Sequence, residues 1–215
     1  MNKGIAHLAL IAGLSLLIAC SGKKQTQDDN STSEATTTET TSGSSKAKDY
    51  LNIPGPIEFD GVAYNLVWSK PNQGGYYIQE YLPEGQNVDT YTDLLIVDYD
   101  TNVSETIERA VKSKVQWMEE RKKTDLAANY KVIKNEEKNE YLVDLLITEG
   151  QVVEWDAIRY IEYKENGKYI GMSTFTLSKR AYGEDVLPFM ERLKSDRKQL
   201  IGKLVAMPAP KVTLK

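Results

Sequence analysis

The sequence is poor in the side chains that most enzymes and many metal sites use. It has one histidine, His7, and one cysteine, Cys20, and both lie in the first twenty residues. Residues 49–215 contain neither, which excludes Ser-His-Asp and Cys-His catalysis, zinc bound by His or Cys, and any disulfide. Catalysis there would have to use carboxylates, lysine, tyrosine or serine. We therefore expect a protein that is not an enzyme and that uses no cofactor and no metal.

The N-terminus has the pattern of an export signal. Lys3 precedes an apolar run, residues 5–18, that is shorter than the roughly 20 residues needed to cross a bilayer. The run ends in Leu17-Ile18-Ala19-Cys20, which resembles the lipobox of bacterial lipoproteins. That resemblance implies cleavage after residue 19 and a diacylglyceryl group on Cys20, and two or three acyl chains form a durable membrane anchor. We predict a signal peptide at 1–19 and lipidation at Cys20.

A polar segment separates this cysteine from the rest of the chain. Residues 20–48 are rich in Ser and Thr and nearly free of apolar side chains, so burial cannot offset their ordering entropy. We predict a flexible linker there, with a root-mean-square span on the order of 30 Å. Residues 49–215 are long enough for one globular domain with its own core. Ser21 after the cysteine resembles the outer-membrane sorting pattern, so we expect an outer-membrane anchor in the bacterial cell envelope, on its periplasmic or surface face.

The charge of the chain restricts its partners. It has 27 basic and 31 acidic residues, a net charge of −4. A mildly acidic surface disfavours nucleic acid and direct adhesion to anionic lipid. We expect membrane lipid to be bound only through Cys20, an envelope protein to be the macromolecular partner, and the chain to be a monomer.

Alternation of apolar residues predicts a mainly antiparallel sheet in the domain. Strands are predicted at 62–68, 76–82, 92–99, 130–134, 141–148, 154–163 and 169–177. Asn166-Gly167 favours a tight hairpin turn, and Asn102 and Asp185 are predicted N-caps of two helices. The predicted fold class is α+β, with six to seven strands covered by two helices in an α/β/α sandwich.

One stretch of the domain is similar to a known family. Residues 76–86, followed by Tyr91-Thr-Asp-Leu-Leu-Ile-Val97 and a long helix, resemble the PsbP-like (Mog-type) α/β/α sandwich family. The later hairpins and the last helix match in order, so the resemblance covers most of residues 49–215. Tyr91 stands at a strand entry where the family pattern also allows Trp. The resemblance implies a non-catalytic accessory or binding role on a larger assembly, and it supplies no functional residue.

Aromatic residues are the main binding candidates. The chain has thirteen tyrosines and three tryptophans, which could form a stacking surface for sugars or peptides or could simply fill half-buried strand faces. Tyr76, Tyr160 and Tyr182 are the tyrosines that we expect to face outward. Arg180 joins Tyr182 in residues 179–183, a predicted loop that either binds a ligand or carries solvated charges.

Two groups of carboxylates are weaker candidates. Glu154 and Asp156 share a strand face and could hydrolyse a glycoside if they lay in a cleft, although a solvated strand face is the favoured interpretation. Residues 98–102 resemble half of a calcium loop, but Val103 and Arg109 occupy positions that need Gly and Glu. The sequence therefore favours a lipid-anchored, non-catalytic interaction module. A glycan- or peptide-binding lipoprotein is the alternative, and a carboxylate-only hydrolase comes third.

Overall fold

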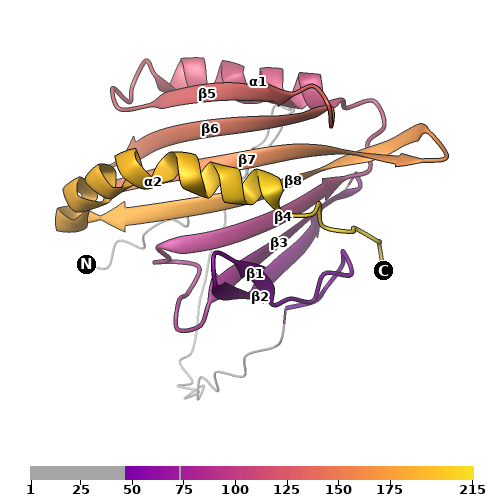
Figure 1. Ribbon diagram of the computed structural model, residues 1–215, viewed down its shortest axis with the longest axis horizontal. Helices are drawn as coiled ribbons and strands as arrows, with labels where there is room; N and C mark the ends of the chain where they lie inside the picture. The colour runs from indigo at the N-terminus through magenta and orange to yellow at the C-terminus, as the bar shows by residue number, and fades with distance from the viewer. Residues whose placement is uncertain (1–46, 73) are drawn as a thin grey trace, which may run out of the picture. The chain divides into compact units, whose positions relative to one another are not determined.

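A computed structural model of the protein describes residues 47–72 and 74–215 (Figure 1). The predicted signal peptide and Cys20 lie outside the described residues, as does nearly all of the predicted linker, and these assignments stay predictions. Within the described part of the chain, no helix has both the length and the apolar character needed to span a bilayer.

The described residues form one antiparallel sheet of eight strands and two α-helices (Figure 1). The strands in sheet order are β1 (Ile57–Phe59), β2 (Val62–Asn72), β3 (Tyr76–Pro83), β4 (Asp93–Asp100), β8 (Lys168–Tyr182), β7 (Val152–Glu165), β6 (Glu140–Glu149) and β5 (Asn129–Asn135). The helices are α1 (Ile107–Arg121) and α2 (Val186–Ala206), and a single 3-10 turn, η1 (Gly183–Asp185), precedes α2. The chain crosses through α1 to the far edge and returns strand by strand, so that β8 pairs with β4.

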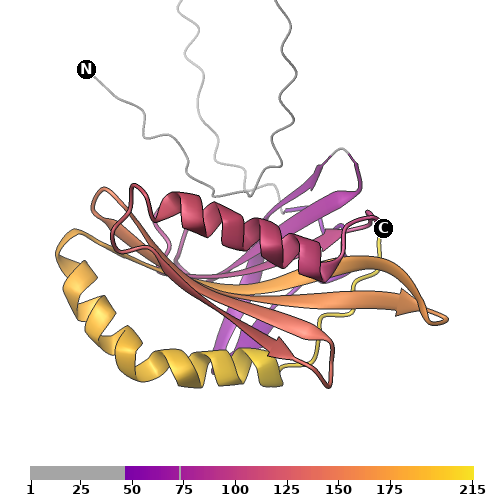
Figure 2. The same ribbon diagram turned by 90° about the horizontal axis from the view of Figure 1, so that it is seen from above.

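The sheet curls into a half-barrel, and its two faces are occupied differently (Figure 2). The inner face carries the main core, in which Trp155 and Phe175 of the long central strands pack with Phe189, Leu193 and Leu204 of α2. The outer face carries the alternate residues of the same strands, and α1 lies against β5, β6 and β7 there. Ile107, Val111 and Met118 form the buried side of α1.

The predicted six-to-seven-strand α/β/α sandwich is wrong. The sheet has eight strands instead of six to seven, and it curls into a half-barrel with α2 along its inner face instead of forming the middle layer of a sandwich. The unpredicted strand is β1, which pairs with β2 across Asp60 and Gly61, both at positive φ (52° and 78°). This Asp-Gly pair is the same kind of hairpin signal as Asn166-Gly167, which was predicted and has φ values of 50° and 77°.

The helix starts differ from the predicted caps. Thr106, not Asn102, caps α1, and its hydroxyl accepts from the Arg109 amide at 3.4 Å. Asn102 instead accepts from the Ser104 amide at 3.1 Å in a local turn. Asp185 does precede α2 as predicted, but its side chain makes no capping hydrogen bond.

The buried side-chain amide of Gln79 fixes the first residues of the domain by hydrogen bonds. Gln79 is fully buried on β3, and its side-chain oxygen accepts from the amides of Tyr50 (2.6 Å) and Leu51 (3.1 Å). The C-terminal tail runs beside the same segment, where the Thr213 amide donates to the Leu51 carbonyl at 3.0 Å. Both ends of the described chain are thereby fixed at one place.

A buried arginine fastens α2 to the inner face. Arg159 of β7 is 2 % exposed and forms a bidentate ion pair with Glu140 of β6, with both N–O distances 2.9 Å. The same guanidinium donates to the carbonyls of Leu204 (3.2 Å) and Met207 (2.7 Å) at the C-terminal end of α2. Only a planar fork with several donors satisfies all of these acceptors at once.

Replacing Arg159 with lysine keeps the charge but removes the fork. We expect Arg159→Lys to lower the free energy of unfolding by about 2–4 kcal/mol, because Glu140 and two helix carbonyls lose buried donors. Denaturant unfolding monitored by circular dichroism measures this. Lys194→Ala is the control, since Lys194 pairs with Glu191 on the exposed side of α2 and should cost less than about 1 kcal/mol. Equal stability of Arg159→Lys and the unaltered protein would contradict the assigned role.

Candidate functional site

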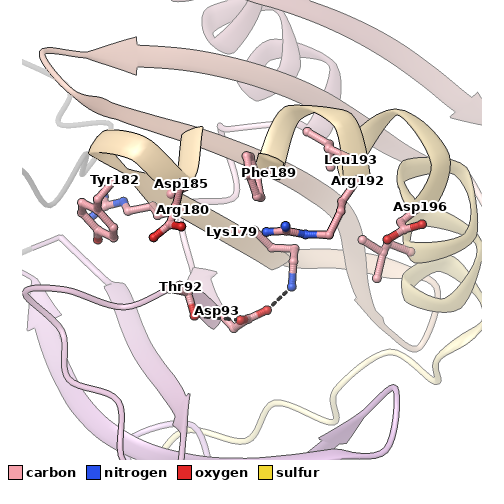
Figure 3. Close-up of a pocket in the computed structure, with 12 residues that line it drawn as sticks. Thr92, Asp93, Lys179, Arg180, Tyr182, Asp185, Phe189, Arg192, Leu193 and Asp196 are labelled. Carbon is pink, nitrogen blue, oxygen red and sulfur yellow. Dashed lines mark hydrogen bonds and ion pairs between the residues drawn. The ribbon is translucent and has the colours of Figure 1, made fainter. Parts of the chain in front are cut away.

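A hollow lies beside the first two-thirds of α2 (Figure 3). Its volume is about 450 Å³, which is within the range of small-ligand sites. Residues of the β3–β4 connection, β4, β8 and α2 line it, namely Thr92, Asp93, Lys179, Arg180, Ala181, Tyr182, Asp185, Phe189, Arg192, Leu193, Asp196 and Leu200. Segments that are far apart in sequence therefore build one concave surface.

The lining combines charges of both signs with an apolar floor. Lys179 and Asp93 form an ion pair across the β4–β8 register. Arg192 extends from the exposed side of α2 over the hollow (Figure 3), and Phe189 and Leu193 contribute buried apolar surface. Such a surface suits a polar partner of mixed charge better than a purely apolar one.

The structure places Arg180 and Tyr182 together at one end of this hollow. The Tyr182 hydroxyl donates to the Tyr91 carbonyl at 2.9 Å, and the Arg180 guanidinium lies 4.2 Å from the centroid of the Tyr91 ring. Arg180 also donates to Glu154 on the outer face. The predicted loop at 179–183 is wrong, because residues 179–182 are the last residues of β8.

A cluster of ionisable side chains occupies the outer face next to Arg180. We name it the outer-face cluster and define it as Glu80 of β3, Asp98 of β4, Glu154 and Asp156 of β7, and Lys114 of α1. The strand register places these carboxylates along one face of the sheet: Asp98 faces Thr174 of β8, Asp156 faces Ser178 four residues further along β8, and Glu80 faces Ile96, in the row between them. Lys114 falls on the sheet-facing stripe of α1, seven residues after Ile107 and four before Met118.

Burial dominates the electrostatics of this cluster. Loss of hydration raises the pKa of Asp156 well above its usual value, and the neighbouring Glu154 charge raises it further. Burial likewise raises the pKa of Asp98, and it raises the pKa of Glu80 to about 7. For Lys114, burial lowers the pKa, which Asp156 and Asp98 partly offset. Burial therefore favours the neutral form of Asp156, Asp98, Glu80 and Lys114 over the charged form that each has in water.

Tyr76 and Tyr160 lie in the same region as Asp98. Asp98 accepts from the Thr174 amide (3.1 Å) and hydroxyl (2.6 Å), and the Tyr76 hydroxyl donates to it as well. Burial, together with the Asp98 charge, raises the pKa of both tyrosines. The expectation that Tyr160 faces outward is wrong, since it is 4 % exposed, and Tyr76 and Tyr182 are half-buried.

The expected environment of the carboxylate pair is corrected too. Glu154 and Asp156 do share one face of β7, but both are buried and do not form a solvated face. Lys114 and Glu80 were not predicted as site residues, although a lysine within an apolar helical stripe is a readable signal. The sequence suggested Asp98 only as a calcium ligand. In the structure it lies on the outer face of β4, where Thr174 and Tyr76 donate hydrogen bonds to it. Among residues 47–72 and 74–215, no three acidic side chains converge to hold a metal ion.

Comparison with known proteins identifies a family but no activity. A model of an uncharacterised protein family matches residues 51–209, and the chain belongs to that family. The matched span begins at the buried Leu51 and ends in the tail that packs on the core, so it covers the whole sheet and both helices. No curated protein and no solved structure matches the chain.

The raised pKa of Glu80 predicts an unusual dependence of stability on pH. The folded state holds this proton more tightly than the unfolded chain does, so Glu80 lowers the free energy of unfolding progressively as pH rises from about 4.5 to about 7. We expect Glu80→Gln to be more stable than the unaltered protein at pH 8, by roughly 1–2 kcal/mol, and equally stable at pH 4. Urea unfolding at both pH values measures the difference. Glu84→Gln, at an exposed turn, should change neither value, and a pH-independent effect of Glu80→Gln would refute the shift.

Proposed function

We propose that the chain is a lipid-anchored, non-catalytic accessory module of the bacterial envelope, whose protein partner binds in the hollow beside α2. The sequence pattern at Cys20 supports the anchor and an outer-membrane location. The single observation that carries the binding role is the hollow itself, with its mixed charges and apolar floor. This proposal keeps the interaction role inferred from the sequence without the sandwich fold.

The position of the hollow supports this role. The described chain enters the domain beside the tail, where the Lys215 amide donates to the Tyr50 carbonyl at 3.1 Å and the Lys215 ammonium pairs with Asp49 at 2.6 Å. Phe189, in the hollow, precedes the C-terminal end of α2 by more than four turns, or roughly 25 Å. Residues 49–51 therefore pack beside the C-terminal tail, which follows the end of α2 opposite to the hollow.

The exposed start of α2 adds apolar contact area near the hollow. Leu187 is 76 % exposed, although it lies between the lining residues Asp185 and Phe189 in the sequence. An exposed leucine with charged neighbours of both signs is the composition of a protein-binding surface rather than of a nucleic-acid site. The hydrolase alternative gains no support, because Glu154 and Asp156 are buried and neither lines the hollow.

In-cell photo-cross-linking tests the proposed surface. A photoreactive phenylalanine analogue at Arg192 of the full lipidated chain should capture one partner in near-equal amount, identified by mass spectrometry. The same analogue at Lys138, in the exposed turn between β5 and β6, is the control and should not capture it.

Two further variants complete this test. Cys20→Ala should release the chain from the membrane fraction and abolish the cross-link, since both depend on the anchor. Lys179→Glu should weaken it about tenfold or more, because it places two acidic side chains at the Asp93 pair. Capture at Lys138 equal to that at Arg192, or a membrane-bound Cys20→Ala chain, would refute the proposal.

A further inference from the structure

The outer-face cluster contains a carboxylate oxygen that the protein leaves unsatisfied. Asp156 is 9 % exposed, and its Oδ1 atom is buried without a hydrogen-bond partner among the described residues. Ser178 hydrogen-bonds the carboxyl group of Asp156, so the group is oriented, but this one oxygen faces no donor. A buried acceptor without a donor costs about 1–3 kcal/mol, which makes this atom a candidate for ligand contact.

Lys114, the basic group with the strongest effect on this carboxylate, also lacks a direct carboxylate partner. Asp156 exerts the strongest favourable charge effect on Lys114, yet among the described residues no carboxylate lies within 4.0 Å of the Lys114 ammonium. The contact made by that ammonium is with the Trp117 ring, 5.1 Å from its centroid. The ammonium is therefore held near Asp156 but separated from it.

The two groups together define the chemistry that fits between them. A hydroxyl group accepts from an ammonium and donates to a carboxylate at the same time. A charged ligand group of either sign would lose its hydration in this buried region and would find a suitable partner on only one of the two sides. Two hydrogen bonds that meet at one hydroxyl oxygen bridge a separation of roughly 4.5–5 Å. The polar pair therefore selects a neutral hydroxyl.

The surroundings extend this selection to more than one hydroxyl. Glu80 of β3 supplies a further carboxyl group on this face, and Tyr76 and Tyr160 supply aromatic rings beside Asp98, which already accepts hydrogen bonds from Thr174 and Tyr76. Carboxylates that accept from hydroxyls, with aromatic rings beside them, form the usual chemistry of sugar recognition. We propose that the outer-face cluster binds a neutral sugar, one hydroxyl of which is held between Lys114 and Asp156. This site is separate from the hollow beside α2.

Lys114 is the flexible member of this pair. Its flexible stem comes from α1 and is half-buried, so the ammonium can move away from Trp117 as a ligand enters. Binding should therefore change the fluorescence of Trp117. This signal gives a readout that does not depend on any partner protein.

The experiment titrates the full-length chain, in a detergent without a sugar headgroup, with a panel of neutral methyl glycosides. Glucosamine and glucuronate serve as cationic and anionic comparisons. We expect saturable binding of at least one neutral glycoside, by Trp117 fluorescence and by calorimetry, about tenfold tighter than either charged sugar. Asp156→Asn and Lys114→Met should each weaken that binding about tenfold or more, because each removes one side of the hydroxyl contact.

Control variants separate this effect from general damage. Lys112→Met makes the same change on the exposed side of α1 and should bind as the unaltered protein does. Trp117→Phe should remove the fluorescence change. If Asp156→Asn fails to fold by circular dichroism, Lys114→Met decides the matter. The proposal is overturned if no neutral glycoside binds, so that a water molecule alone meets Asp156, if the charged sugars bind as well as the neutral ones, or if both site variants bind normally.

Discussion

The ion pair between Arg159 and Glu140 is the interaction on which the inner face depends. It joins β6 and β7 to the end of α2, and burial keeps water away from most of its hydrogen bonds. A curled sheet with α2 along its inner face needs such a fastening, because apolar packing alone does not fix where a helix ends. Asp144 adds a second polar link, since it accepts from the Trp155 ring nitrogen at 2.7 Å and from Arg197 of α2.

The outer face of the same strands has a different balance of charges and hydrogen bonds. On the inner face the charges of Arg159 and Glu140 are matched and fully hydrogen-bonded, whereas the outer-face cluster has more acidic than basic groups and an unsatisfied oxygen at Asp156. Sheets place alternate residues on opposite faces, so adjacent positions of β7 experience these two environments in turn. A protein tolerates an environment like that of the outer-face cluster only where the rest of its core supplies enough stability. Unsatisfied polar groups of this kind are often functional.

The sequence predicted most strands and both helices, because local signals determine them. Alternation located β2 to β8, and Asn166-Gly167 located the β7–β8 turn. The strand that was missed, β1, is three residues long, too short to show alternation. The curl could not be predicted, because it depends on which strands pair, and β4 pairs with β8 across the intervening residues 101–167.

The candidate sites were predicted less well than the elements. Tyr76 and Tyr160 were chosen as exposed aromatics, and the structure instead brings them to Asp98 inside the outer face. Arg180 and Tyr182 do line the hollow, but much of the rest of its lining comes from Thr92, Asp93 and α2. Spacing along one strand cannot show which distant strand or helix supplies the remaining charges, and those charges decide whether a carboxylate is solvated or buried.

The joined termini have a mechanical consequence. A pulling force applied at the N-terminal end of the domain acts first on the segment at residues 49–53, which Gln79 holds from the third strand of the sheet and the tail holds from the other side. The load thus passes to the interior of the sheet and bypasses the short edge strand β1, which has only one neighbour. The edge strand would otherwise be the first to peel away, and this arrangement spares it.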